Sequence, residues 1–293
     1  RETDRPIFVL CTDETNAGTL AADLEAMLGE SVVQLTGRDL ALRDIEVVSR
    51  QEEQRRLRAL DALYAGALVA VCTVSGLLQR TLPPDILENA AFTLRLGEGE
   101  GPEALEPRLL ACGYRRSDMV EGPGQFSRRG GILDIFSPGA ERPVRAEFWG
   151  DEIDTISYFD AETQRRTDQI TEVTISPAVE VVPDSMSILA KKLEAHAKTL
   201  RGKAAPAAKE VLLREADKLK NDLHIGCMDK YYTFVYETVA TLFDYFDTDA
   251  LLVFSEGSKL KERMRTTLWQ WGEDVRGPVS YTHLRAHETP EHL

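Results

Sequence analysis

Apolar residues in the first 75 positions fall into short continuous runs and longer stripes at helical spacing. Three runs have the length of buried strands: Pro6–Cys11, Val32–Leu35 and Leu68–Thr73. Between them, Leu20–Leu28, which Gly29 ends, and Glu52–Tyr64 carry apolar residues on one helical face. Strands alternating with helices predict an α/β fold, with a parallel sheet covered by helices.

The pattern changes after Pro83-Pro84. A short strand at Thr93–Leu96, a glycine-rich loop at Gly97–Pro102 and a helix over Glu103–Ala111 come first. Glycine and proline turns then separate short apolar segments: Phe126–Arg128, Ile132–Phe136, Val144–Trp149, Ile153–Phe159 and Ile170–Ile175. These segments predict a second domain of α+β type, with an antiparallel sheet and one helix.

Lysine-rich helical segments dominate the last third of the chain. Helices are predicted over Ser185–Leu200, Ala207–Leu223, Tyr232–Phe246 and Gly257–Trp271, with a buried strand at Ala250–Phe254. We interpret the charges of the first two helices as solvated faces.

Four segments follow from these changes of pattern. Residues 1–92 form the α/β segment and 93–177 the α+β domain, while 178–276 form a helical segment that also holds the last predicted strand. Residues 277–293 resemble translated read-through and are treated as non-native. His283 and His287 in this tail are spaced to share a helix face, as metal ligands can be, but we assign them no site.

The formal net charge of −14 disfavours a nucleic-acid-binding module, because phosphate neutralisation requires basic surface. No Lys precedes Lys191, so Arg is the cation of the middle segment, and Arg is enriched at protein interfaces. No apolar run is long enough for a membrane span and no signal-peptide pattern is present, so we expect a cytoplasmic protein. The four cysteines are far apart and are interpreted as separate buried thiols.

The sequence contains no recognisable catalytic constellation. It has no G-x-x-x-x-G-K-[ST] string, and Gly97, Gly99 and Gly101 are interleaved with acidic residues that would repel a polyphosphate. The strand at Ala250–Phe254 is followed by Ser255–Ser258, where a Mg²⁺ site would need an Asp first. We therefore expect no catalytic activity, cofactor or metal in this chain.

Three strings of the middle segment resemble the UvrB-interaction-type domain: Cys112–Arg116 (CGYRR), Gln125–Gly139 (QFSRRGGILDIFSPG) and Pro143–Asp160 (PVRAEFWGDEIDTISYFD). That domain occurs in the excinuclease helicase subunit UvrB and in the transcription-repair coupling factor family. The flanks resemble the coupling-factor family: Asp39–Leu57, Val71–Pro84 and Tyr232–Phe254. The resemblance covers residues 6–254.

The resemblance implies a split helicase-like lobe with degenerate ATP motifs, whose first part is residues 1–92 and whose second part, with further helices, is residues 178–276. It implies that the domain inserted between them, residues 93–177, docks the damage-recognition ATPase UvrA. The positions matching the family's contact residues are Arg129, Arg145 and Trp149. It also implies that RNA polymerase, DNA, ATP and Mg²⁺ are bound by other parts of the full-length protein, an ATP-driven translocase that displaces stalled polymerase.

Strand alternation gives an independent expectation for the same residues. Val144, Ala146 and Phe148 should pack beneath the helix, so Arg145, Glu147 and Trp149 should face water. An exposed Trp beside Arg, with Arg128 or Arg129 on the neighbouring strand, has the composition of an interface hot spot.

Glu147, Asp151 and Glu152 would then orient the partner by charge. Three alternatives stay open. Trp149 could simply cap the edge of the sheet, the chain could be an ATP-dependent helicase fragment of UvrB type, or it could be a nucleic-acid-binding module.

Overall fold

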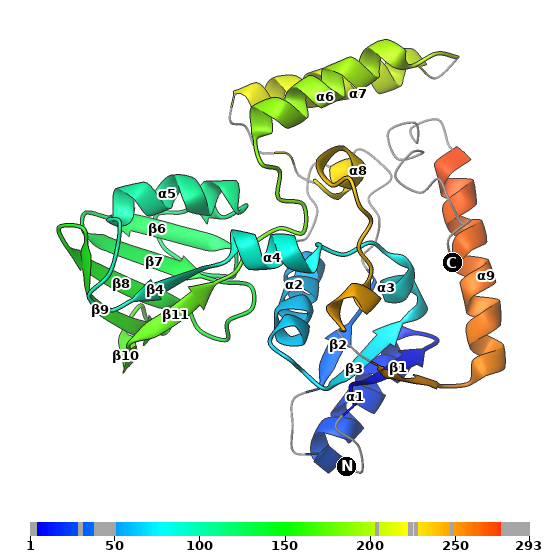
Figure 1. Ribbon diagram of the computed structural model, residues 1–293, viewed down its shortest axis with the longest axis horizontal. Helices are drawn as coiled ribbons and strands as arrows, with labels where there is room; N and C mark the ends of the chain where they lie inside the picture. The colour runs from blue at the N-terminus through cyan, green and yellow to red at the C-terminus, as the bar shows by residue number, and fades with distance from the viewer. Residues whose placement is uncertain are drawn as a thin grey trace. The chain divides into compact units, whose positions relative to one another are not determined.

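The structure is a computed structural model, and it describes residues 5–28, 32–37, 51–202, 205–221, 225, 228–246 and 249–276. Figure 1 shows the order of its helices and strands. Several residues discussed above lie outside the described residues: Gly29, residues 39–50 of the segment Asp39–Leu57, Cys227 among the four cysteines, and the tail with His283 and His287. In the described part, no helix is both long enough and apolar enough to cross a membrane.

A parallel sheet forms the centre of the first unit. It contains β1 (Ile7–Cys11), β2 (Val33–Leu35), β3 (Val69–Thr73) and β12 (Leu251–Phe254), in the order β12-β1-β3-β2. All three pairings are parallel, which confirms the predicted α/β class. Helix α1 (Glu14–Leu28) packs its apolar face on β1 and β3.

Polar residues at the ends of β1 and β3 cap the helices that follow these strands. Asp13 accepts a hydrogen bond from the backbone N–H of Asn16 (2.9 Å), and this bond holds the pKa of Asp13 below its usual value. In the same way Thr73 caps α3 (Val74–Leu78) by accepting a bond from Gly76 N–H. Short polar side chains at strand ends thus set where α1 and α3 begin.

Strand β12 was predicted correctly, but its predicted burial was wrong. Leu251, Leu252 and Val253 are 41–44% exposed and Phe254 is 60% exposed. The reason is its place at the edge of the sheet, where β1 is its only strand partner among the described residues.

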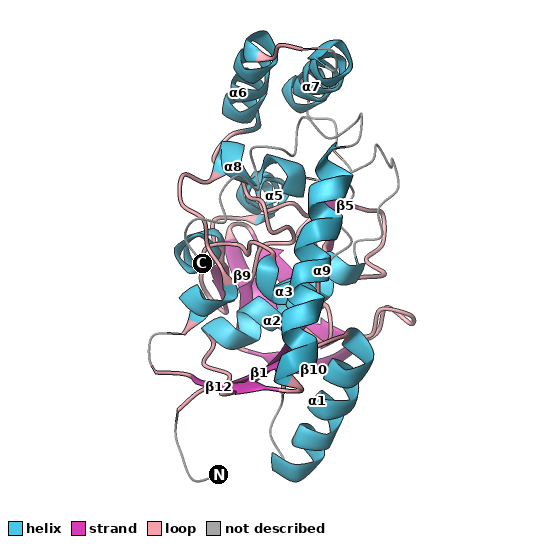
Figure 2. Ribbon diagram, turned by 90° about the vertical axis from the view of Figure 1, so that its right-hand side faces the viewer, coloured by secondary structure: helices cyan, strands magenta, loops and turns pink. Residues whose placement is uncertain are grey.

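Two antiparallel helices, α6 (Met186–Thr199) and α7 (Ala205–Lys220), form a hairpin and lie side by side in Figures 1 and 2. Leu189, Leu193, Leu212 and Leu219 are buried between them. Ser185 caps α6 by accepting a bond from Ile188 N–H. The two lysine-rich helices expected from the sequence are therefore present.

The single helix predicted over Tyr232–Phe246 was wrong. The chain forms η1 (Asp229–Tyr231), α8 (Tyr232–Val235) and η2 (Leu242–Tyr245), with extended backbone at Tyr236. The phenol of Tyr232 donates to the carbonyl of Thr81 (2.9 Å) and accepts from Ala240 N–H (3.0 Å). These hydrogen bonds hold Tyr232 against distant backbone, and Thr241 caps the start of the separate 3₁₀ helix η2, so one continuous helix cannot form. Helix α9 (Gly257–Arg276) follows β12.

The second unit is built on a six-stranded sheet in the order β10-β9-β8-β7-β6-β5. Its strands are β5 (Arg115–Arg116), β6 (Gln125–Arg129), β7 (Ile132–Phe136), β8 (Val144–Trp149), β9 (Glu152–Phe159) and β10 (Arg166–Ile170). The pairings are antiparallel except that of β5 with β6. Helix α5 (Pro102–Ala111) buries Leu105 and Leu109 against one face of the sheet.

The strand predicted over Ile170–Ile175 is in fact parts of two strands. Residues up to Ile170 belong to β10, whereas β11 (Glu172–Ile175) pairs with β4 (Phe92–Arg95) in a separate two-stranded sheet. One predicted segment therefore contributes to two sheets, which periodicity alone does not reveal.

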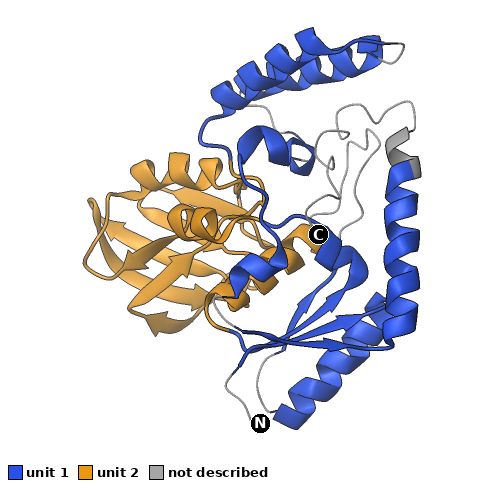
Figure 3. Cartoon of the chain, turned by 45° about the vertical axis from the view of Figure 1, so that its right-hand side comes forward, with its two compact units in different colours: residues 1–50, 67–81, 183–293 blue, residues 51–66, 82–182 orange. Residues whose placement is uncertain are grey.

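Figure 3 shows the two compact units in different colours. Unit 1 comprises residues 1–50, 67–81 and 183–293, and unit 2 comprises residues 51–66 and 82–182. Unit 2 also contains α2 (Gln51–Tyr64) and α4 (Pro84–Ala90), which the sequence analysis placed in the segment 1–92.

A buried ion pair fixes α2 within unit 2. Arg56 Nε lies 2.8 Å from Glu180 Oε1, and both side chains are at most 1% exposed. The amide of Gln54 also donates to the carbonyl of Pro123 (2.6 Å). The ion pair thus joins Arg56 and Glu180, 124 positions apart in sequence, inside one core.

Replacing Arg56 with Met should destabilise unit 2 by about 3 kcal/mol or more, because Glu180 would keep a buried charge without its partner. Urea denaturation, with hydrogen exchange of the β6–β9 amides, measures the loss. Arg55→Ala is the control: Arg55 is 61% exposed and pairs with Glu52 on the surface, so its loss should cost less than about 1 kcal/mol. Equal losses in the two variants would contradict the role of the buried pair.

Asp61 on α2 should make the stability of unit 2 depend on pH. Burial raises the pKa of its carboxyl group to about 6, with a hydrogen bond from Ser176 opposing the shift. A carboxyl group with a raised folded-state pKa stabilises most below its unfolded pKa, near 4. Stability should therefore fall between pH 4 and 6 and level off above. Asp61→Asn should remove this slope in urea denaturation from pH 4 to 7, and an unchanged slope would show another group to be responsible.

Candidate protein-docking face

The two faces of the six-stranded sheet differ along β8. Val144 and Ala146 are at most 2% exposed and lie in the core beneath α5, and Phe148 packs against the same core. Arg145 and Glu147 alternate with them and lie on the opposite face. The alternation expected from the sequence is therefore present in β8.

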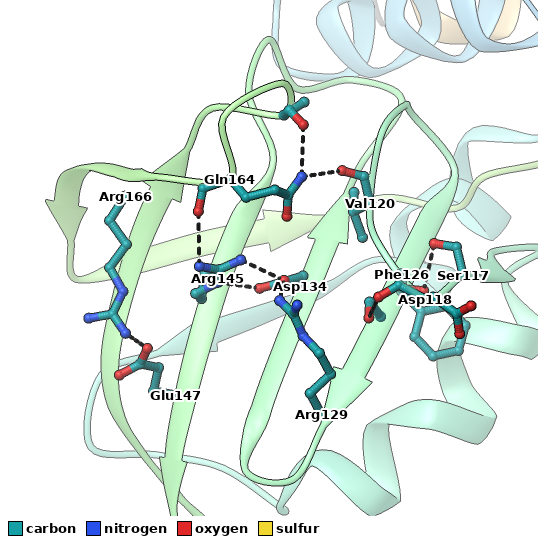
Figure 4. Close-up of polar contacts among 12 residues, drawn as sticks. Ser117, Asp118, Val120, Phe126, Arg129, Asp134, Arg145, Glu147, Gln164 and Arg166 are labelled. Atoms are coloured by element: carbon teal, nitrogen blue, oxygen red, sulfur yellow. Dashed lines mark hydrogen bonds and ion pairs between the residues drawn. The ribbon is translucent and has the colours of Figure 1, made fainter.

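A buried carboxylate organises that opposite face. Asp134 on β7 is fully buried and accepts bonds from Arg145 Nε (2.6 Å), Arg145 Nη2 (2.8 Å) and Arg129 Nη2 (2.7 Å). Figure 4 shows both guanidinium groups pointing toward Asp134. These bonds raise the pKa of Arg145 above its usual value. One carboxylate thus ties β6, β7 and β8 together.

Arg145 was expected to face water, and this was wrong. Its side chain is only 12% exposed, since besides Asp134 it contacts the carbonyl of Gln164 (3.3 Å) and lies over the ring of Phe159, 4.6 Å from its centroid. The opposite face of a sheet need not be solvated when a loop covers part of it.

Arg128 and Arg129 are consecutive residues of β6, so their side chains lie on opposite faces of the sheet. Arg129 lies on the Asp134 face and is 50% exposed. Arg128 lies on the other face, where it pairs with Glu103 (3.1 Å) and Glu106 (2.9 Å) of α5. Both belong to β6, which β7 separates from β8, so neither is on the strand adjacent to Trp149 as the sequence analysis expected.

Glu147 is engaged within the sheet. It is 23% exposed and forms an ion pair with Arg166 of β10, itself 47% exposed (Figure 4). Its charge is therefore largely compensated before any partner arrives. Asp151 and Glu152 at the β8–β9 turn are exposed.

Trp149 is the most exposed large apolar side chain of the described residues, at 86%. It ends β8 opposite Glu152, next to the turn at Gly150, whose φ of 64° suits glycine. A β-bulge precedes it, because Glu147 pairs with Thr155 but Phe148 pairs with Ile153. After the bulge Phe148 still reaches the core, while the indole projects from the sheet.

The glycine-rich loop braces this turn. Gly97 N–H donates to Ile153 O (2.8 Å) and Gly101 N–H donates to Asp151 O (3.2 Å), while Ile153 N–H donates to Glu98 O. A Cβ at Gly99 would lie 2.5 Å from the carbonyl oxygen of Asp151, so glycine is required there. The loop's N–H groups are thus used to hold the turn beside Trp149, a role the sequence analysis did not foresee.

Loops cover the far end of the Asp134 face. Val120, Phe136 and Phe159 form a small core there, and the side-chain amide of Gln164 donates to Val120 O (2.9 Å) and Ala161 O (2.7 Å). The open part, here called the docking face, is the end that holds Arg129, Ile132, Glu147, Trp149 and Arg166.

The position where a Mg²⁺ site was sought lies in unit 1. Ser255 N–H donates to Leu10 O (3.0 Å), and Glu256 is paired with Lys259 (2.7 Å). The single acid after β12 is therefore engaged by a neighbouring lysine.

Asp134→Ala should destabilise unit 2 by about 3 kcal/mol, because it leaves the buried Arg145 without its counter-charge. Trp149→Ala should change stability by less than about 0.5 kcal/mol, since its side chain is exposed. Thermal and urea denaturation of the two variants measure this difference. A larger loss in the Trp149 variant would show that its indole is part of the fold.

Residues 92–180, which include every residue of the docking face, match the family model described as the UvrB interaction domain. The chain is 32% identical over 270 residues to a transcription-repair-coupling factor of Bacillus subtilis and 30% identical over 269 residues to one of Staphylococcus aureus. Each alignment covers 89% of this chain and 23% of the relative.

The chain thus spans about a quarter of the length of these relatives. Its similarity to them extends through both units and is not limited to the inserted domain. We conclude that residues 92–180 match the UvrB interaction domain family and lie in a chain that is similar, over most of its length, to transcription-repair-coupling factors.

Proposed function

We propose that the docking face binds UvrA and so recruits nucleotide excision repair to stalled transcription complexes. The observation that carries the proposal is the exposed indole of Trp149, held on a braced turn beside the half-exposed Arg129. The name of the matching domain family and those of the relatives support it.

The docking face has the composition of a binding hot spot. Trp and Arg are among the residues most enriched in hot spots. Trp buries a large surface with few rotatable bonds, and Arg can donate several hydrogen bonds to a partner. Binding would cover an indole that is 86% exposed and a guanidinium that already has one bond, to Asp134, and needs no reorganisation. The face therefore offers one apolar anchor and one fixed cation.

The charges of the face indicate what the partner should present. On this face Arg129 and Arg166 outnumber Glu147 by one, although the whole chain is strongly acidic. A complementary partner would offer an apolar pocket for the indole and a carboxylate for Arg129. Asp151 and Glu152 at the rim would repel acidic groups of the partner in any orientation that brings them to the rim, and so would favour one orientation.

The wider role is a proposal about the whole protein. The relatives named above are coupling factors, which supports a transcription-coupled role over a UvrB-type helicase fragment. ATP-driven translocation along DNA and displacement of RNA polymerase would reside in regions that the relatives have beyond the aligned segment.

The proposal is tested by measuring the affinity of UvrA for the chain and for single variants by calorimetry or surface plasmon resonance. Trp149→Ala and Arg129→Ala should each weaken binding by tenfold or more, about 1.4 kcal/mol at a hot spot. Trp269→Ala is the matched control, since Trp269 on α9 is 63% exposed and lies in unit 1.

Unchanged affinity in both docking-face variants, with the fold intact by circular dichroism, would reject this face. Arg145→Ala is unsuitable as a first test, because it removes two of the three arginine bonds to buried Asp134, whereas Arg129→Ala removes one and leaves the pair with Arg145 in place.

A further inference from the structure

The α6–α7 hairpin, residues 186–220, differs in charge from the rest of the chain. It holds nine Lys or Arg and four Asp or Glu residues, a surplus of five positive charges, whereas the whole chain has a net charge of −14. Positive potential is therefore concentrated on one element of an acidic protein.

Four lysines share one side of the hairpin, here called the lysine face: Lys191, Lys198, Lys209 and Lys220. Lys191 and Lys198 are seven residues apart on α6, and Lys209 and Lys220 are eleven apart on α7, so each pair shares a helix face. The bond from Lys220 Nζ to Glu194 Oε1 (2.5 Å) places both pairs on the same side, because Glu194 lies between Lys191 and Lys198.

Little of this charge is neutralised within the protein. Glu194 is paired with Lys220, and none of the ion pairs among the described residues involves Lys191, Lys198 or Lys209. The hydrogen bond from Lys220 lowers the pKa of the Glu194 carboxyl group, and the charge of Lys198 adds a smaller effect in the same direction. Three lysines of the face therefore keep their charge available to a ligand.

The composition of the lysine face suits phosphate rather than protein. Aromatic residues are prominent in protein hot spots, but residues 186–220 contain no Trp, Tyr or Phe, and the exposed large apolar side chains described in the hairpin are Ile188 and Leu213. Lysine is a flexible point charge that pairs with phosphate without needing a fixed geometry.

The spacing of the lysines also fits a double helix. At 1.5 Å rise per residue, the two pairs are separated by roughly 10 and 16 Å along their helices. The major groove of B-DNA is about 12 Å wide between phosphate backbones, so lysines at these separations can contact phosphates on both sides of a groove.

We propose that the lysine face binds the phosphate backbone of duplex DNA without reading its sequence. The site lies in unit 1 and does not depend on the docking face of unit 2. It replaces our interpretation of the α6 and α7 charges as merely solvated, and it limits the argument from net charge: an acidic chain can carry a local basic site.

The test is fluorescence anisotropy of a short labelled duplex titrated with the complete chain at several salt concentrations. Affinity should fall as salt rises, and Lys191→Glu with Lys209→Glu should weaken binding at least tenfold at about 50 mM salt and make the salt dependence shallower. Lys218→Glu with Lys261→Glu is the matched control, with the same change of net charge on the other side of α7 and on α9; it should weaken binding less than threefold.

Three outcomes would overturn the proposal. Duplex binding that is absent or insensitive to salt would remove the site, and equal weakening by the control would show an effect of net charge alone. Competition by poly-glutamate as effective as competition by unlabelled duplex would assign the face to an acidic polypeptide. Circular dichroism of each variant checks that the hairpin stays helical.

Discussion

The buried carboxylate of Asp134 is the interaction on which unit 2 and its docking face depend. It receives two bonds from Arg145 and one from Arg129, so it connects the three central strands through side chains as well as through their backbone ladders. A buried charge is stabilised only when its partners are well placed, so the positions of both arginines are fixed. Arg129 can offer its remaining donors to a partner because Asp134 holds its position.

The docking face and the lysine face differ in rigidity and in how far their charges are paired within the protein. The docking face is a rigid sheet surface with one aromatic anchor and internally paired charges, which suits a shaped protein partner. The lysine face consists of mobile cations on helices with few internal partners, which suits a uniform polyanion. The two faces lie in different units of the chain, so the two binding proposals can be tested independently.

Much of the fold could be predicted because local patterns and tertiary structure agree. The continuous apolar runs of β1 and β3 and the alternation of β8 have the periods that parallel and antiparallel strands require. Prediction failed where tertiary contacts override the pattern: Tyr232 bonds to the backbone of distant Thr81, so an apolar stripe of helical period breaks after one turn. The exposure of β12 likewise depends on its place in the sheet order.

The site was predictable only in part, for a similar reason. Strand alternation places Arg145 on the correct face, but it cannot show that Asp134 and the Gln164 loop enclose it. The signal that could have revealed this is a single Asp inside the apolar strand Ile132–Phe136, since a charge in such a strand must find a buried counter-charge.

The glycine-rich loop that braces the β8–β9 turn has a thermodynamic consequence for recognition. Because backbone bonds from Gly97 and Gly101 already fix the turn that carries Trp149, little conformational entropy remains to be lost when the indole is covered. The anchor is thus ordered in advance, and differences in affinity among partners should arise mainly from how long each complex persists once formed.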